Sequence, residues 1–191
     1  MAGLVYLSSA EDISLGPVTQ SVAPPPPSAL PPAMRSAPEP DKSSFKAYNE
    51  WQMKTNGMAF PESELRQMYS CNPDGSLKDY LVSQDVRDAL FAGLKSPEYE
   101  RIRVPVLALY PLPIPLGDQL KRYKPENAEQ GAAMGLKYGL DLAWIARNAD
   151  DLKRRVRGAR VVEVPNANVY IFLSNEPVVL RELRTFLAAL H

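Results

Sequence analysis

The sequence has few of the histidine and cysteine side chains that most often act as a general base, a thiol nucleophile or a zinc ligand. It contains one histidine, His191, at the last position, and one cysteine, Cys71. A general base must be well positioned before its pKa matters, and a residue at a fraying chain end is poorly positioned. A zinc site needs several Cys or His ligands, and no glycine-rich phosphate-binding loop occurs. The sequence therefore predicts no metal and no cofactor.

The acidic residues give no clearer indication. Several carboxylates in the middle of the chain have a spacing that is common on solvated helix faces: Glu62, Glu64, Asp85 and Asp88. A hydrolase that uses a pair of carboxylates is left open by this pattern, but no feature favours it.

The composition indicates which kinds of partner and which cellular compartment can be expected. Lys plus Arg and Asp plus Glu both number 22, so the net charge is zero. This balance gives no electrostatic reason to expect nucleic acid or an anionic membrane as a partner. No apolar run approaches the ~18–20 residues that span a bilayer, and one cysteine allows no intrachain disulfide. The default expectation is a cytoplasmic protein with no membrane and no nucleic-acid partner.

The elements that would position any site alternate along the chain. Apolar runs typical of buried strands occur at 4–7, 102–110 and 159–164. Helical patterns occupy 126–157, with a break expected near Gly135 or Gly139, and 176–190. In the first of these helices we expect Asp150, Asp151 and residues 153–155 to face solvent. This alternation predicts an α/β fold with a partial parallel sheet of about three strands and flanking helices.

The region between the first two predicted strands differs in character. Proline is concentrated from Pro17 to Pro40, which predicts an extended, polyproline-like segment. A stiff connector on the domain surface and a ligand for an aromatic groove are both compatible with it. Residues 42–95 predict a layer of short helices with a turn at 72–75, and the stripe Phe45, Tyr48 and Trp51 is expected to face a core. Residues 111–118 are too rich in proline to predict a regular element.

Two phrases of the sequence carry a family resemblance. The first is the phrase Ala2-Gly3-Leu4-Val5-Tyr6-Leu7. The second is the order of elements from Val104–Tyr110 through a long helix to 159–177. In both places the sequence resembles the C-terminal portion of α/β-hydrolases. The resemblance implies a first core strand in residues 1–15, a connector and helical cap insertion in 16–100 and the C-terminal core in 101–191. It also implies a parent activity of serine-dependent hydrolysis of a carboxylic ester or similar small molecule, without a cofactor.

The catalytic positions of that family are not filled here. No Gly-x-Ser-x-Gly turn occurs, and the resemblance places it before Ala2. The catalytic histidine position is held by Val169, which has no nitrogen to accept a proton and is expected to be a packed loop residue. Ser8 stands at the acid position. Asp12 and Asp118 are either leftover acids or ordinary loop carboxylates.

Two functions follow as expectations. The first is a truncated or degenerate hydrolase that is inactive alone. The alternative is a protein-interaction module that uses an exposed sheet edge and the Pro-rich arm. In either case we expect the apolar edge at Leu4–Leu7 to be covered by self-association or by a second chain, because bare strand edges invite pairing. A split enzyme, with the nucleophile on another chain, would still lack a base at Val169.

Overall fold

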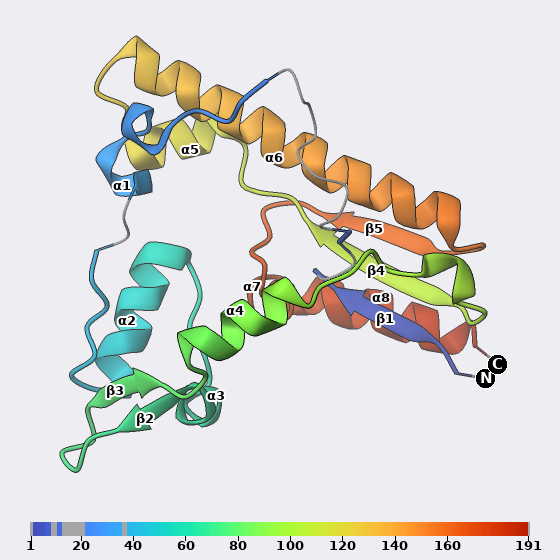
Figure 1. The fold of residues 1–191 in the computed structure, drawn as a ribbon, viewed down its shortest axis with the longest axis horizontal. Helices are drawn as coiled ribbons and strands as arrows, with labels where there is room; N and C mark the ends of the chain where they lie inside the picture. The colour runs from blue at the N-terminus through green and yellow to red at the C-terminus, as the bar shows by residue number, and fades with distance from the viewer. Residues whose placement is uncertain (1, 9–10, 13–21, 36–37, 191) are drawn as a thin grey trace. The chain divides into compact units, whose positions relative to one another are not determined.

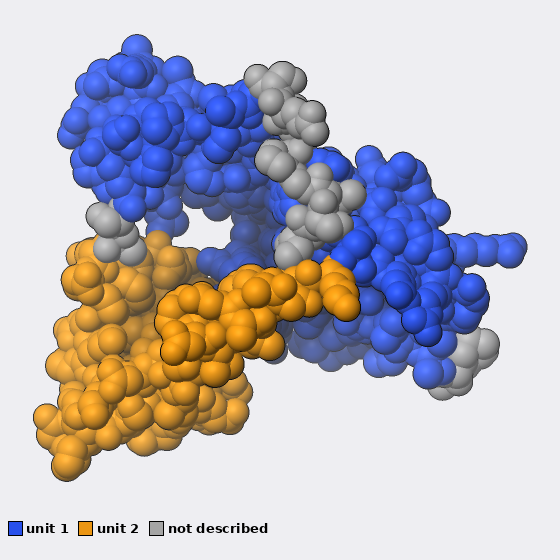
Figure 2. Space-filling model, in the orientation of Figure 1, with its two compact units in different colours: residues 1–36, 96–191 blue, residues 37–95 orange. Residues whose placement is uncertain are grey.

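The computed structural model describes residues 2–8, 11–12, 22–35 and 38–190. The chain divides into two compact units, one of residues 1–36 and 96–191 and one of residues 37–95 (Figure 2). No helix among the described residues is long and apolar enough to cross a membrane. His191 and parts of the Pro-rich arm, 17–21 and 36–37, lie outside the described residues.

A parallel sheet forms the centre of the first unit. Its strands β1 (Leu4–Leu7), β4 (Val106–Pro111) and β5 (Arg160–Val164) lie in the order β1-β4-β5, all parallel (Figure 1). Leu4 pairs with Val106 in the register, and Leu107 pairs with Arg160. Strands β1 and β5 lie within the predicted runs, whereas β4 begins later than expected and extends one residue beyond its run, to Pro111. The expected α/β class with a partial parallel sheet is confirmed.

The side chains of β4 explain why that run is apolar throughout. Val106, Ala108 and Tyr110 pack against α6 (Ala128–Arg155), while Leu107 and Leu109 pack against α8 (Glu176–Ala188). Because successive strand residues point to opposite faces, a strand covered on both faces needs apolar residues at every position. The sheet thus lies between α6 and α8 (Figure 1).

Helices α5 and α6 differ from the expectation. Helix α6 is 28 residues long and continuous, so the expected break at Gly135 or Gly139 is wrong. A single glycine costs a helix only about 1 kcal/mol, which the packing of α6 on the sheet offsets. Helix α5 (Leu116–Tyr123) begins directly after Pro115, within the stretch expected to be irregular. Proline is compatible with a helix start, where its missing N–H has no helical partner.

The described part of the Pro-rich arm is not simply extended. It forms a short 3-10 helix, η2 (Pro27–Ala29), and one turn of helix, α1 (Pro32–Arg35). Leu30 is buried with Ala133 and Met134 of α6. This part of the arm therefore packs on the surface of the first unit as a connector.

The second unit contains helices α2 (Phe45–Asn56), α3 (Glu62–Met68) and α4 (Gln84–Ala92). The turn at 72–75 is confirmed, but it joins two strands, β2 (Tyr69–Cys71) and β3 (Leu77–Tyr80), in an antiparallel hairpin. The expectation of a purely helical layer is therefore wrong. Of the predicted aromatic stripe, Phe45 and Tyr48 are buried as expected, whereas Trp51 is only half-buried.

The short remaining elements complete the first unit. The 3-10 helix η3 (Tyr99–Arg101) precedes β4, and one turn of helix, α7 (Ile171–Ser174), precedes α8. Both lie next to loops that carry residues of the candidate functional site described below.

Candidate functional site

The loops at the carboxyl ends of the three parallel strands border a shallow, open pocket of about 300 Å³. In open α/β sheets this end of the strands is the usual place for ligands. We call it the carboxyl-end pocket. Its lining comes from the ends of β1, β4 and β5 and from one side of α6: Ser8, Glu11, Pro111, Pro113, Asp141, Trp144, Ile145, Ala167 and Val169.

Ser8 and Val169, which lie 161 positions apart (169 − 8) in the sequence, line this same pocket. Ser8 has a left-handed backbone, with φ of 61°, and its N–H donates to the carbonyl of Leu109 at 2.9 Å. A left-handed conformation at a residue other than glycine is costly and persists where the surroundings impose it. The structure therefore brings together the two positions that the family resemblance assigned to the acid and the base.

Val169 is not the packed loop residue that we expected, because it is 59% exposed. The loop is held by its neighbours: the N–H of Ala167 donates to the carbonyl of Leu112, and the N–H of Asn168 donates to Ser174 Oγ at 3.0 Å. Asn166 begins the loop in a left-handed conformation, with φ of 54°. These bonds fix the backbone and leave the isopropyl group of Val169 at the pocket surface.

Glu11 and Trp144 supply the pocket with a carboxyl group and an aromatic ring. Glu11 is exposed, but the protein atoms around it partly desolvate its carboxyl group and raise its pKa, and a hydrogen bond from the Trp144 side chain partly opposes that shift. Desolvation disfavours a charge that has no cation beside it, which explains the direction of the shift. The second carboxylate, Asp141, is paired with Lys137 of the same helix at 2.5 Å.

Sequence reasoning missed both Glu11 and Trp144. Trp144 shares one side of α6 with apolar residues, which gives no signal of a site, and Glu11 follows the first strand without any motif. The available signal was position alone, since residues directly after a parallel strand gather at the carboxyl edge of the sheet.

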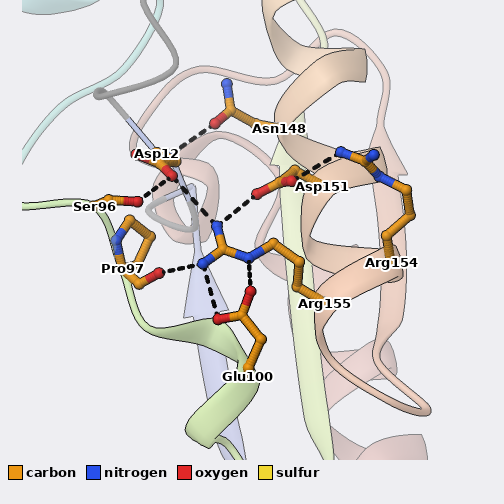
Figure 3. Close-up of polar contacts among 8 residues, drawn as sticks. All are labelled: Asp12, Ser96, Pro97, Glu100, Asn148, Asp151, Arg154 and Arg155. Carbon is orange, nitrogen blue, oxygen red and sulfur yellow. Dashed lines mark hydrogen bonds and ion pairs between the residues drawn. The ribbon is translucent and has the colours of Figure 1, made fainter.

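Next to the pocket, Asp12 lies in a buried polar network rather than in a solvated loop (Figure 3). It is 1% exposed, and its Oδ2 accepts a hydrogen bond from Ser96 Oγ at 2.8 Å. Its backbone N–H donates to Asn148 Oδ1 of α6 at 2.7 Å. Of the two possibilities that the sequence left open for Asp12, the ordinary loop carboxylate is therefore wrong.

Arg155 is the centre of this network (Figure 3). Its Nη1 lies 3.1 Å from Asp151 Oδ2 and 3.4 Å from Asp12 Oδ2, and its Nε lies 2.5 Å from Glu100 Oε1. Its Nη2 donates to the carbonyl of Pro97 at 2.7 Å. The hydrogen bond that Arg155 donates to Glu100 lowers the pKa of that carboxyl group. The bonds that Arg155 donates to Glu100 and Asp151 raise the pKa of its own guanidinium.

The same contacts correct the expectation that residues 150–151 and 153–155 all face solvent. Asp151 is buried, and the Arg155 side chain is 23% exposed, because Asn148, Asp151 and Arg155 recur on one side of the helix. Tyr99 packs below Arg155, with the guanidinium carbon 5.0 Å from the ring centre, and burial raises the pKa of Tyr99 to about 12.

The other acid candidate, Asp118, is outside the pocket. It lies in the first turn of α5, exposed to solvent, and its Oδ1 accepts from Lys121 at 2.9 Å. Neither Asp12 nor Asp118 lines the carboxyl-end pocket. Within the described ranges, no group of three or more His, Cys, Asp or Glu residues could hold a metal ion.

No protein-family model, curated protein or solved structure matches this chain. The argument about function therefore depends on the pocket and the sheet themselves.

Proposed function

We propose that this chain is a degenerate relative of the ester-cleaving α/β-hydrolases whose carboxyl-end pocket binds a small molecule without hydrolysing it. The observation that carries the proposal is the meeting of Ser8 and Val169 in one pocket at the carboxyl ends of the strands. The strand order β1-β4-β5, consecutive and parallel with helices between, is compatible with the C-terminal portion of such a sheet.

The chemistry of the lining supports binding rather than turnover. A serine nucleophile needs a base within hydrogen-bond reach, and an alkyl group stands at the base position, Val169. Among the residues that line the pocket, Ser8 offers a hydroxyl and Glu11 a carboxyl group, and most of the others are apolar. A concave, mainly apolar pocket with a few polar groups is typical of small-molecule sites.

The test uses the fluorescence of Trp144. The chain has two tryptophans, so Trp51→Phe leaves Trp144 as the single reporter. We expect ethyl butyrate to change this fluorescence saturably and to be recovered intact. Ala167→Phe, which fills the pocket, should abolish the change, while Ala132→Phe on the exposed side of α6 should not.

Two results would overturn this proposal. One is the absence of saturable binding by any small ester. The other is hydrolysis of 4-nitrophenyl butyrate above the buffer rate that Ala167→Phe abolishes and Ala132→Phe leaves unchanged.

A second function, protein interaction through the sheet edge, is favoured by one specific observation. Strand β1 pairs with β4 on one side only among the described strands, and Leu4 and Val5 are 40% and 39% exposed. An open, apolar strand edge can add a strand from another chain. On this reading a second chain, or a second copy of this one, covers Leu4–Leu7.

The oligomeric state, measured by a hydrodynamic method, distinguishes a chain whose β1 edge is covered by another chain from a monomer whose β1 edge is free. We expect Val5→Lys to shift a self-associated chain to monomer, because a charge at an edge blocks strand pairing. Deletion of residues 17–40 should release a partner that is held by the Pro-rich arm. A wild-type chain that is a monodisperse monomer, retains no partner in pull-downs and binds no hydrophobic dye would exclude the interaction function.

A further inference from the structure

The charges around the carboxyl-end pocket have one sign. Its described lining contains two carboxylates, Glu11 and Asp141, and no lysine or arginine. The charge of Asp141 is balanced by Lys137, which lies outside the lining, at 2.5 Å. Glu11 is therefore the group whose charge a ligand would complement.

The groups around Glu11 leave its carboxylate available to a cation. The Trp144 side chain donates one hydrogen bond to the carboxylate and so orients it. A neutral donor of this kind leaves the negative charge in place, whereas a lysine or arginine would cancel it. Glu11 is exposed at the rim of the pocket and only partly desolvated by it, so a cation that enters the pocket can reach the carboxylate and return part of the solvation that its ionised form has lost.

The walls indicate what kind of cation fits. Pro111, Pro113, Ile145, Ala167 and Val169 present apolar surface, which cannot replace the water around a small inorganic ion. Alkyl groups attached to a positive nitrogen can contact such walls. Trp144 adds an indole ring to the lining, and indole is the aromatic side chain that attracts cations best.

We propose that the carboxyl-end pocket selects a small organic cation, an alkylated ammonium compound about as large as choline, with Glu11 as its counter-ion. This deepens the proposed function and rests on it. A volume of about 300 Å³ is at the lower end of the range for small-molecule sites, as a ligand of this size requires.

The experiment compares a charged ligand with its neutral isostere. Choline and 3,3-dimethylbutan-1-ol have nearly the same shape and differ by one charge. In the Trp51→Phe chain we expect choline to bind about tenfold more tightly than the alcohol. Glu11→Gln should remove most of this difference by weakening the binding of choline and should leave the affinity for the alcohol unchanged, while the indole of Trp144 retains the remainder. Glu129→Gln, at an exposed position on α6 outside the pocket, is the matched control.

The outcomes separate this inference from the proposed function. If the two ligands bind equally and Glu11→Gln changes neither affinity, the cation inference is wrong while the pocket remains a small-molecule site. If neither ligand binds but ethyl butyrate does, the inference again fails alone. If Ala167→Phe leaves choline binding unchanged, choline binds elsewhere and the assignment to this pocket is wrong.

Discussion

Replacement of Arg155 by methionine should be among the most damaging single changes in the first unit. Methionine keeps much of the length and apolar stem of arginine but removes the guanidinium that contacts Asp12, Asp151 and Glu100. The side chains of Asp12 and Asp151 are 2% and 7% exposed, so solvent cannot replace the lost cation at either carboxylate.

The magnitude follows from what each carboxylate retains. Removal of one partner from a buried ion pair costs about 3–5 kcal/mol. Asp12 keeps its hydrogen bond from Ser96, and Asp151 keeps Arg154 at 2.9 Å. We therefore expect a loss at the lower end, about 3 kcal/mol. With a urea m-value of about 2 kcal/mol/M, the unfolding midpoint should fall by about 1.5 M.

The matched control is Arg154→Met in the preceding position. The Arg154 side chain is 72% exposed, and its pair with Asp151 should contribute at most about 1 kcal/mol. Asp12→Asn should destabilise the wild-type chain but restore part of the stability of Arg155→Met, because it removes the carboxylate that has lost its cation. Urea midpoints for the two arginine variants that differ by less than about 0.3 M would refute this account of the network.

Three further predictions concern other parts of the molecule. Hydrogen bonds from two arginines, Arg160 and Arg181, lower the pKa of Glu182 from 4.5. The ionised form of Glu182 therefore stabilises the fold above pH about 4.5, and this contribution is lost as the pH falls through the lowered pKa. Glu182→Gln should reduce the unfolding free energy more at pH 7 than at pH 3. Gly3→Ala would place a Cβ 2.9 Å from Phe186 Cζ, so we expect a loss of about 1–3 kcal/mol in urea unfolding, partly recovered by adding Phe186→Leu. In the second unit Leu65 is fully buried and Leu90 is 66% exposed, so Leu65→Ala should cost about 2–5 kcal/mol in thermal unfolding and Leu90→Ala less than about 0.5 kcal/mol.

The sheet was predictable chiefly because its central strand, β4, is covered on both faces. A central strand such as β4 must be apolar at every position, and few other short elements have that pattern. The closing helix was equally clear, because α8 starts with Pro177 in its first turn and buries Val179 and Phe186 on one face. Both elements can be recognised from the apolar pattern of their own residues, without knowledge of distant contacts.

The hairpin β2-β3 was missed for the opposite reason. Its strands have three and four residues, and only Leu77 in them is buried. With so little burial, no alternation of apolar and polar residues develops, although the turn that joins the strands is evident from its residues. Strands this short are specified by their partners rather than by their own pattern.

The polar network could not be predicted because its members are far apart in the sequence. Arg155 and Asp12 are separated by 143 positions, and a basic run at the end of a helix is usually solvated. The exposure of Val169 was missed because it depends on the backbone bonds of the loop. The neighbouring sequence gives no indication of which loop residue those bonds leave at the surface.

Glu11 and Asp12 connect the polar network to the carboxyl-end pocket, because they are consecutive in the chain. Glu11 lines the pocket, and Asp12 belongs to the network. Asp12 enters the network with Arg155, whereas Glu11 accepts from Trp144 at the pocket. Helix α6 carries both partners, with Trp144 about three turns before Arg155. We therefore expect Asp12→Asn, in chains that remain folded, to weaken choline binding severalfold although Asp12 does not touch the pocket. Asp118→Asn, an equal change of charge on the exposed face of α5, should leave choline binding unchanged. Equal affinity in the wild-type and Asp12→Asn chains would show that Glu11 is positioned without the network.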